Sequence, residues 1–394
     1  MDLAKIAADH KSPALAGFVS AITGLAASTG VVLAGMTAVG ATKPQVATVI
    51  VFMVAGYGIM SMVLSKIFKM PVSIVWSTPG AAMMVAAGTL HLGFGQATAA
   101  FLVTGALITL TGFWPTLGRL VSAIPKGIAN AMLAGVIFGF CVAPFQAVMN
   151  YPGIVVPALL VWLVLYRYAT VWASAAAIVV TYSLIAIEMP ADLSHVQMWS
   201  GFSLVAPQFD ISAIVSLAIP LYLVTMASQN VPGIAIMNSF GYTIPFKPVI
   251  MTTGLATMAG SFLGGYAFNL AAITGAMNAN EHAHPDPKRR WLSSVYGGVF
   301  FLIFAIFASP IVAFVLETPR VLILASSGIA LFGTLGNALF EITTDTKIRM
   351  PATVAFLVGA SGITMWGIGG AFWALMAGLA VWGFTQLPNL RKTA

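Results

Sequence analysis

Charged residues are scarce in this sequence of 394 residues, since only 7% are Asp, Glu, Lys or Arg while 59% are hydrophobic. A soluble domain carries about 25% charged residues. The composition therefore excludes a soluble globular protein and predicts an all-α polytopic membrane protein. Polar stretches are too short for a sizeable soluble domain. Residues 1–13 lack the features of a cleaved signal peptide, so we expect the first apolar segment to be retained.

Cysteine and the motifs of several enzyme classes are also missing. The single cysteine, Cys141, excludes an intramolecular disulfide. Sequences typical of zinc proteases, α/β-hydrolases and P-loop ATPases are absent, which argues against an intramembrane enzyme or an ATP-driven pump. His282 and His284 stand in a Pro-rich stretch without regular ligand spacing, so we expect no metal site and no cofactor.

Acidic and basic side chains are missing from the middle of the apolar segments. The 10 acidic residues all fall in the termini, in loops or at segment ends. Charges inside a membrane usually mark the paths of ions and protons. A ligand site in this chain must therefore be built from backbone, hydroxyl, amide and aromatic groups.

The chain contains fourteen apolar segments, seven in each half. We expect them at 14–39, 46–67, 71–90, 94–114, 120–140, 153–166 and 171–187, and at 211–228, 249–263, 266–280, 291–314, 320–342, 352–368 and 371–387. An odd number of segments in each half makes the two halves enter the bilayer in opposite senses, as inverted repeats. We therefore expect a first repeat at 1–190, an external loop at 191–210 and a second repeat at 211–394.

The basic residues test this topology. With the N-terminus in the cytoplasm, fourteen of the seventeen Lys and Arg residues fall on the cytoplasmic side. Lys and Arg accumulate in cytoplasmic loops of membrane proteins. We therefore expect both termini to be cytoplasmic, and we attribute the net charge of +7 to topology rather than to a nucleic acid or another acidic partner.

Segments 3 and 10 look interrupted. In segment 3, the bulky run 71–76 leads into Ser77-Thr78-Pro79-Gly80, and in segment 10 the run that starts at Tyr266 leads into Thr274-Gly275-Ala276. Thr78 and Thr274 are 196 positions apart, close to half the chain. Two interrupted segments at matching positions of two halves indicate the binding site of a transporter.

Each interruption predicts a half-helix, opened by Pro79-Gly80-Ala81 in one half and by Thr274-Gly275-Ala276 in the other. A helix N-terminus exposes unpaired N–H groups and binds anions without a basic side chain. Ser77, Thr78 and Thr274 are candidate caps or donors. Together with aromatic neighbours, these termini suit a compact monoanion with an apolar body, such as an aromatic carboxylate. The alternative is that the interruptions are only packing kinks.

Three amides extend this candidate site. Gln229 and Asn230 end segment 8 before Pro232-Gly233, which we expect to stop the helix, and Asn269 lies in segment 10. They orient the ligand or satisfy the backbone of the broken helices. The hydroxyl groups in segments 1 and 8 likewise have two possible roles: they line the cavity, or they only bond the backbone or a neighbouring helix. The candidate substrate-binding residues are Trp76, Ser77, Thr78, Pro79, Gly80, Gln229, Asn230, Tyr266, Phe268, Asn269, Thr274, Gly275 and Ala276.

Over nearly its whole length the chain resembles the BenE family of benzoate:proton symporters. The resemblance is carried by Ser77-Thr78-Pro79-Gly80, by Ser228-Gln229-Asn230-Val231-Pro232-Gly233, and by Asn269 with Thr274-Gly275-Ala276-Met277. The chain is also similar to the uracil permease fold. This resemblance implies that segments 3 and 10 each pair a short strand with a half-helix. It also implies a core of segments 1–4 and 8–11 that moves against a gate of segments 5–7 and 12–14.

One departure separates the chain from the nucleobase permeases. Phe268 stands where their tenth segment has an acidic residue, and Ser228 or Gln229 stands where their eighth segment has another. Without these acids, the N–H groups of a nucleobase have no acceptors, and a carboxylate meets no repulsion. The departure favours an aromatic acid, and it leaves the residue that carries the proton unidentified.

These observations predict a secondary active transporter that imports an aromatic carboxylate, with benzoate as the expected substrate, by proton symport and alternating access. The alternatives are a permease for nucleobases or other weak acids and a passive anion channel. We expect the cytoplasmic (inner) membrane as its location and the lipid bilayer as its surroundings. A homodimer, as in related folds, stays open.

Overall fold

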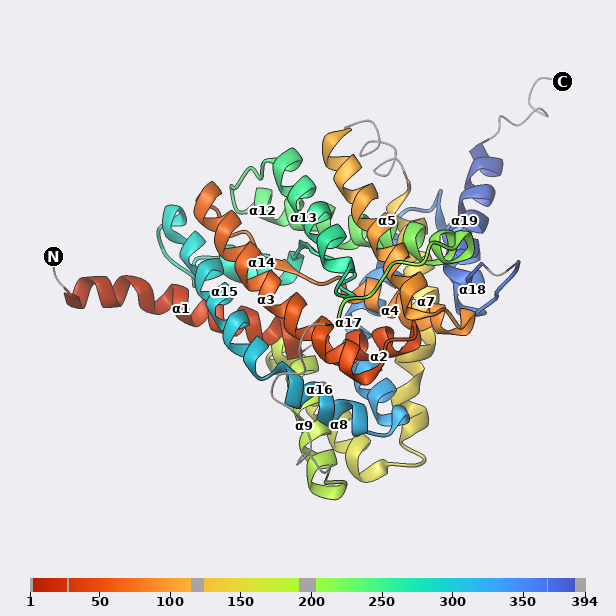
Figure 1. Cartoon of the computed structure of the whole chain (residues 1–394), viewed down its shortest axis with the longest axis horizontal. Helices are drawn as coiled ribbons and strands as arrows, with labels where there is room; N and C mark the ends of the chain where they lie inside the picture. Colours follow the sequence, from red (N-terminus) through yellow and green to blue (C-terminus); the bar gives the residue numbers. More distant parts are fainter. Residues whose placement is uncertain (1–2, 27, 115–123, 191–202, 367, 387–394) are drawn as a thin grey trace.

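We describe the fold from a computed structural model, which covers residues 3–26, 28–114, 124–190, 203–366 and 368–386 (Figure 1). Three sequence predictions concern residues outside these ranges: most of the external loop at 191–202, the start of segment 5 at 120–123, and the end of segment 14 at Leu387. Of the basic residues used to assign the topology, Arg119, Arg391 and Lys392 also lie outside them.

The first half of the chain consists of helices and one short strand. The elements are α1 (Leu3–Ala26), α2 (Thr29–Ala38), α3 (Lys43–Phe68), β1 (Ile74–Val75), α4 (Thr78–Ala87), the 3-10 turn η1 (Gly88–Leu90), α5 (Phe94–Phe113), α7 (Lys126–Ala147), α8 (Pro152–Tyr168) and α9 (Thr170–Glu188).

The second half also consists of helices and one short strand. It comprises α10 (Ile211–Ala213), the π-helical turn η2 (Ile214–Ala218), α11 (Ile219–Thr225), the π-helical turn η3 (Met226–Asn230), α12 (Val231–Ser239), α13 (Phe246–Ser261), β2 (Asn269–Leu270), α14 (Ala272–Ala279), the 3-10 turn η4 (Pro287–Arg289), α15 (Trp291–Ile306), α16 (Ala308–Glu317), α17 (Arg320–Thr344), α18 (Arg349–Ala360) and α19 (Gly370–Gln386).

The structure confirms a helical membrane protein. Within the described part of the chain, seven helical stretches are long and apolar enough to cross a membrane: Asp9–Ala38, Lys43–Phe68, Phe94–Phe113, Lys126–Ala147, Ile211–Ser239, Pro287–Ile306 and Arg320–Thr343. Four shorter apolar helices accompany them, at Pro152–Tyr168, Trp172–Glu188, Ala308–Glu317 and Arg349–Ala360.

Segment 11, which we expected to be continuous, is broken, and segment 1 is irregular at Ser28. Segment 1 forms the helical stretch Asp9–Ala38, in which Ser28 has a φ of −142° between α1 and α2. The hydroxyls of Ser28 and Thr29 bond the carbonyls of Gly24 and Leu25 at 2.9 and 2.7 Å. Segment 11 consists of α15 and α16. Pro310 lies in the first turn of α16 and lacks the N–H that would continue the helical ladder across the break.

Three helix ends also differ from the predicted segment ends. Segment 5 was expected to end at residue 140, but α7 continues to Ala147. Segment 8 does not end at Ser228, because Ile211–Ser239 forms one helical stretch that includes both π-helical turns. Pro232 lies in the first turn of α12, directly after η3, where a shifted hydrogen-bond register tolerates its missing N–H. Segment 13 is shorter than predicted, since α18 ends at Ala360 and Gly362 follows with a left-handed φ of 63°.

The helices from the two halves interleave. α3 packs against α15, α5 against α13, and α7 against α17, so each of these pairs joins one helix from each half. Figure 1 shows α7, α17 and α4 close to the centre of the view, with α8, α9 and α16 grouped below them. The paired strands β1 and β2 also join the two halves, with Ile74 opposite Leu270 and Val75 opposite Asn269 in an antiparallel register.

Charged contacts gather where short loops meet. The Asp9 carboxylate pairs with Arg289 and lies 3.0 Å from Nε2 of His284. Lys69 lies over the ring of Trp291, with its ammonium 4.1 Å from the ring centroid. These contacts tie the N-terminal part of α1 and the end of α3 to the loop between α14 and α15.

Candidate functional site

The candidate site is built around the strand pair. Each strand leads directly into a short helix: β1 is followed by α4, which begins at Thr78, and β2 is followed by α14, which begins at Ala272. Because the strands are antiparallel, the two helices leave the pair in opposite directions, with their N-termini at the strands. The prediction that Thr274-Gly275-Ala276 opens the second half-helix was wrong by two residues, so Thr274 lies in its first turn.

The first half-helix begins as its sequence indicates. Ser77 is the N-cap of α4, and its hydroxyl accepts a hydrogen bond from the Gly80 N–H at 3.0 Å. Pro79 lies in the first turn, where its missing N–H leaves no gap in the helical pattern. Thr78 is the first helical residue. The hydroxyl of Tyr266 donates to the Ser77 carbonyl at 2.9 Å, so the second interrupted segment supports the cap of the first.

The second half-helix has no side-chain cap. Its N-cap is Ala271, whose N–H instead bonds the Ser73 carbonyl at 3.0 Å. The Gly275 N–H bonds the Ala271 carbonyl at 3.1 Å. Gly275 is buried, yet a Cβ there would have only the Met237 sulfur nearby, at 4.0 Å. Ala276 is half-buried on the same helix.

Trp76 connects the strand pair to segment 1. Its indole N–H donates to the Ser28 hydroxyl at 2.6 Å, between α1 and α2. Ser28 in turn bonds the Gly24 carbonyl. Trp76 therefore holds segment 1 against β1, and its ring lines the cavity described below.

The candidate residues Phe268 and Gln229 have surroundings that differ from those of the residues at the strand pair. Phe268 is buried between α3 and α13, where its ring packs 4.9 Å from that of Tyr57 and 6.0 Å from that of Phe52, measured between centroids. Gln229 is half-buried in the π-helical turn η3. Its neighbour Asn230 is fully buried, and its side-chain oxygen accepts the Leu270 N–H at 3.0 Å.

Asn230 thus anchors the strand to the π-helical turn, and this contact predicts a stability effect. Asn230→Leu keeps the volume of the side chain but leaves the buried Leu270 N–H without an acceptor, which costs about 1–3 kcal/mol. We expect a lower melting temperature of the purified protein in detergent. Asn238→Leu is the matched control, because Asn238 is exposed on α12. Equal melting temperatures of the two variants would contradict this role of Asn230.

Six buried polar side-chain atoms have no hydrogen-bond partner within the described residues. They are Oγ1 of Thr23, Thr225 and Thr274, Oγ of Ser309, and Oδ1 of Asn269 and Asn278. Asn269 lies in β2 and Thr274 in the first turn of α14, so these two belong to the strand pair and its second half-helix. α1, which carries Thr23, packs against α14, and a Cβ on Gly24 would lie 3.3 Å from the Thr274 methyl group. Buried polar groups are normally satisfied, so Asn269 and Thr274 are suited to a polar ligand.

Thr23 and Thr225 belong to rows of hydroxyl residues in segments 1 and 8, for which the sequence leaves both a cavity role and a packing role open. Other hydroxyls of those rows bond their own backbone, as Ser28 and Ser228 do. Spacing does not distinguish the free hydroxyls from the bonded ones, because the partner is set by the neighbouring helix. Only the tertiary structure separates them.

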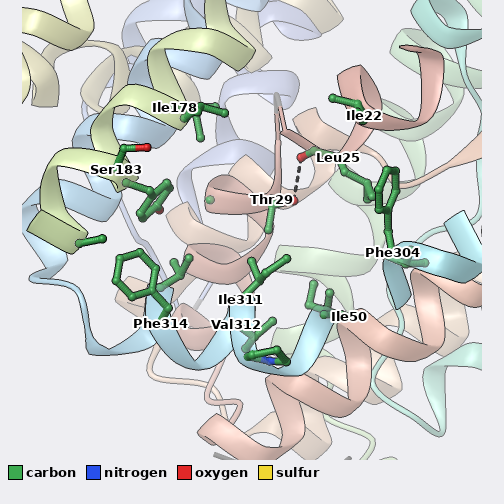
Figure 2. A pocket seen from close by; sticks show the side chains of 18 of the residues that line it. Ile22, Leu25, Thr29, Ile50, Ile178, Ser183, Phe304, Ile311, Val312 and Phe314 are labelled. Carbon is green, nitrogen blue, oxygen red and sulfur yellow. Dashed lines mark hydrogen bonds between the residues drawn. The ribbon is translucent and has the colours of Figure 1, made fainter. Parts of the chain in front are cut away.

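An apolar cavity of 670 Å³ reaches the site from one side (Figure 2). Ile22 and Leu25 of α1, Ile178 and Ser183 of α9, and Ile311 and Phe314 of α16 surround it, and Trp76 forms part of its wall. Its other lining residues are Thr29, Gly30, Ile50, Val54, Val179, Tyr182, Ala186, Phe304, Ala308, Pro310, Val312 and Val315.

Two polar groups of the cavity wall are already engaged. The Thr29 hydroxyl bonds the Leu25 carbonyl at 2.7 Å, the dashed contact in Figure 2, and the Tyr182 hydroxyl lies 3.2 Å from that of Ser326. None of the lining residues carries a charge. The cavity therefore suits an uncharged, apolar body. Of the candidate residues from the sequence, only Trp76 lines it.

Known proteins with similar sequences agree on a single family. The family model of BenE, described as benzoate membrane transport protein, matches residues 7–384. The inner membrane protein YdcO of Escherichia coli (strain K12) is 36% identical over 365 residues, which cover 92% of this chain and 93% of that protein. The benzoate membrane transport protein of Acinetobacter baylyi is 30% identical over 341 residues, which cover 85% of each chain.

Solved structures show the same fold at low sequence identity. The transmembrane domain of BicA, a cyanobacterial bicarbonate transporter, has a TM-score of 0.61 at 14% identity, over 94% of this chain and 97% of that domain. SLC26A9 has a TM-score of 0.60 at 14% identity, over 95% of this chain and 64% of that one. The family match spans nearly the whole chain and confirms the resemblance carried by the interrupted segments. The chain therefore belongs to the BenE family of benzoate membrane transport proteins and is a membrane transporter rather than an enzyme.

Proposed function

We propose that this protein is a secondary active transporter that imports benzoate, or a closely related aromatic carboxylate, by proton symport and alternating access in the inner membrane. The observation that carries the proposal is the pair of half-helices that start at one strand pair, where Asn269 Oδ1 and Thr274 Oγ1 are buried without a hydrogen-bond partner within the described residues. Membership of the BenE family and the name of the Acinetobacter relative support benzoate as the substrate.

The site residues have distinct proposed roles. The N-termini of α4 and α14 supply N–H groups for the carboxyl group, with Ser77, Thr78, Pro79 and Gly80 shaping the first and Thr274, Gly275 and Ala276 the second. Trp76 contacts the ring where the cavity meets the strands, and Gln229 and Asn269 orient the ligand. Asn230, predicted for the same role, holds β2 in place by accepting the Leu270 N–H. We predicted that Tyr266 and Phe268 contact the ring of the substrate. Their proposed role is instead to support the strand pair, because the Tyr266 hydroxyl bonds the Ser77 carbonyl and the Phe268 ring packs against the Tyr57 ring.

We propose fourteen segments in two inverted repeats, at 1–190 and 211–394, joined by the external loop 191–210. The core comprises segments 1–4 and 8–11, and the gate comprises segments 5–7 and 12–14. Helix packing supports this division, because α3–α15 and α5–α13 pair within the core while α7–α17 and α18–α19 pair within the gate. The apolar cavity lies between α9 of the gate and α1 and α16 of the core.

Both termini are proposed to be cytoplasmic. The contacts of Asp9 with His284 and Arg289, and of Lys69 with Trp291, bring three regions together: the N-terminal part of α1, the end of α3, and the chain from the α14–α15 loop to the start of α15. Lys43 pairs with Glu317 in the loops that the predicted topology assigns to the other side. This separation of basic clusters agrees with the excess of Lys and Arg in cytoplasmic loops.

Uptake of labelled benzoate into proteoliposomes, with and without an inward proton gradient, tests the proposed function. We expect accumulation above equilibrium only when the gradient is present, and none in empty liposomes. Equilibration that ignores the gradient would replace the symporter with a passive pathway. No uptake under either condition would remove benzoate as the substrate.

A further inference from the structure

The side-chain oxygen of Asn269 is an acceptor at the strand pair that lacks a donor within the described residues. Asn269 is fully buried in β2, and its Oδ1 has no hydrogen-bond partner within the described residues. An amide oxygen can only accept a hydrogen bond. Whatever completes this site must therefore bring a donor to Asn269.

The orientation of the amide is fixed by its surroundings. Its Nδ2 lies 3.5 Å from the Trp76 carbonyl oxygen and 3.3 Å from the Leu270 carbonyl oxygen. Rotation of the amide by half a turn would place Oδ1 against these two oxygens, where no donor is available. Oδ1 of Asn269 therefore stays on the side of the amide that faces away from these two carbonyl oxygens.

The described residues offer no titratable donor to Asn269. Tyr57 of α3 lies beside the residues that precede β2, and its hydroxyl donates to the Ala267 carbonyl at 2.9 Å. The Tyr266 hydroxyl, just before β2, donates to the Ser77 carbonyl. The Tyr222 hydroxyl of α11 lies 2.5 Å from that of Thr111. β1, η3 and α14 contain no acidic or basic residue, and Lys247 of α13 lies at the far end of its helix, over the Phe113 ring.

A carboxylate cannot satisfy this set of groups, whereas a carboxylic acid can. The carboxylate has acceptors only, so it can bond the Thr23 and Thr274 hydroxyls but leaves Asn269 Oδ1 unpaired. The acid adds one O–H donor and keeps a carbonyl oxygen for the hydroxyls and the α14 N-terminus. The adjoining cavity has no charged residue on its wall, and a buried charge without a partner is costly.

Building on the proposed function, we infer that the species bound at the strand pair is the undissociated aromatic acid, whose O–H is donated to Asn269 Oδ1. The symported proton then travels on the substrate. A carboxylate takes up a proton from one side of the membrane, crosses as the neutral acid and releases the proton on the other side. Proton and carboxylate move together, no net charge crosses, and no residue of the protein changes its protonation.

Binding of three ligands to the purified protein tests this inference. Benzamide is neutral and keeps an N–H donor, while benzenesulfonate stays an anion without a donor. Since a carboxyl group has a pKa of about 4, the apparent affinity for benzoate should fall about tenfold per pH unit between about pH 5 and pH 8. About one proton should be taken up per bound benzoate. Benzamide should compete independently of pH, and benzenesulfonate should not compete.

The opposite outcomes have separate meanings. Competition by benzenesulfonate at an affinity similar to that of benzoate, or benzoate binding without proton uptake, overturns the inference and leaves benzoate transport standing. Failure of benzoate to bind at any pH overturns both the inference and the proposed function. This series uses the unaltered protein and does not depend on the folding of a variant.

A variant pair locates the acceptor. Asn269→Leu should weaken binding of benzoate and benzamide by at least about tenfold, as expected for the loss of a buried hydrogen bond. Asn278→Leu is the matched control, because Asn278 Oδ1 is also buried without a partner but belongs to the last turn of α14. Equal binding by the two variants would refute the role of Asn269.

Discussion

Gly275→Phe is expected to reduce benzoate uptake by about 10- to 100-fold while the protein is still produced and inserted. Gly275 lies in the first turn of α14, where its N–H already bonds the Ala271 carbonyl. α12 packs directly against this helix. Filling a packed space typically costs about 1–3 kcal/mol, which corresponds to this change in affinity or rate.

The space around Gly275 limits the size of the side chain that can replace it. A Cβ there would lie 4.0 Å from the Met237 sulfur, which is ordinary contact, so alanine fits without any shift. A phenyl ring extends beyond that sulfur and must displace either α12 or the first turn of α14. Because that turn is the proposed carboxyl site, the displacement affects the ligand directly.

Gly275→Ala is therefore the control, and we expect it to retain uptake. Alanine also favours the helix by about 1 kcal/mol over glycine, so any loss in this variant would not come from a weaker helix. Uptake into proteoliposomes and the melting temperature of each purified variant distinguish a blocked site from an unfolded protein. Uptake by a folded Gly275→Phe variant at the level of the unaltered protein would remove α14 from the proposed site.

Gly328→Leu is expected to destabilise the folded protein by at least about 3 kcal/mol, the upper end of typical overpacking effects. A Cβ on Gly328 of α17 would overlap the Phe140 carbonyl oxygen of α7, and it would lie 2.8 Å from Cδ of Pro144. A backbone carbonyl and a proline ring cannot rotate away as a flexible side chain does. The two helices must separate along their contact.

Gly333→Leu on the same helix is the matched control. Gly333 is exposed, and a Cβ there would meet no heavy atom within 4 Å. Both substitutions replace glycine with a good helix former, so their intrinsic helical preferences are equal. Melting temperatures and the fraction of monodisperse protein in detergent compare them. A Gly328→Leu variant as stable as Gly333→Leu would show that α7 and α17 are not held at this distance.

The class of protein and the first half-helix follow from local features of the sequence. A low share of charged residues is a property of the whole chain, and it excludes a soluble domain whatever the packing. Ser77 and Pro79 start α4 because a cap bond spans three residues and proline favours the first turn. Such effects act within a few positions, so the sequence alone predicts them.

The helix boundaries of segments 8 and 10 depend on distant contacts. Pro232 is followed by a continuing helix because η3 shifts the hydrogen-bond register, and the Asn230 side chain in that turn is bonded to Leu270, 40 positions away. α14 starts at Ala272 because the preceding residue bonds the Ser73 carbonyl of the other interrupted segment. Neither of these partners can be predicted from the residue pattern of a single segment.

The sequence by itself determined that this chain is a membrane protein with two interrupted segments at matching positions, and it pointed to the family. The tertiary structure decided which side chains remain free to bind. Ser28, Asn230 and Tyr266 are engaged with other elements, whereas Thr23, Thr274 and Asn269 Oδ1 are buried without hydrogen-bond partners within the described residues. The physical reason is that a hydrogen-bonding group is available only when no neighbour in space satisfies it. Such a neighbour can lie far away in the chain, as Ser77 does from Tyr266, 189 positions apart.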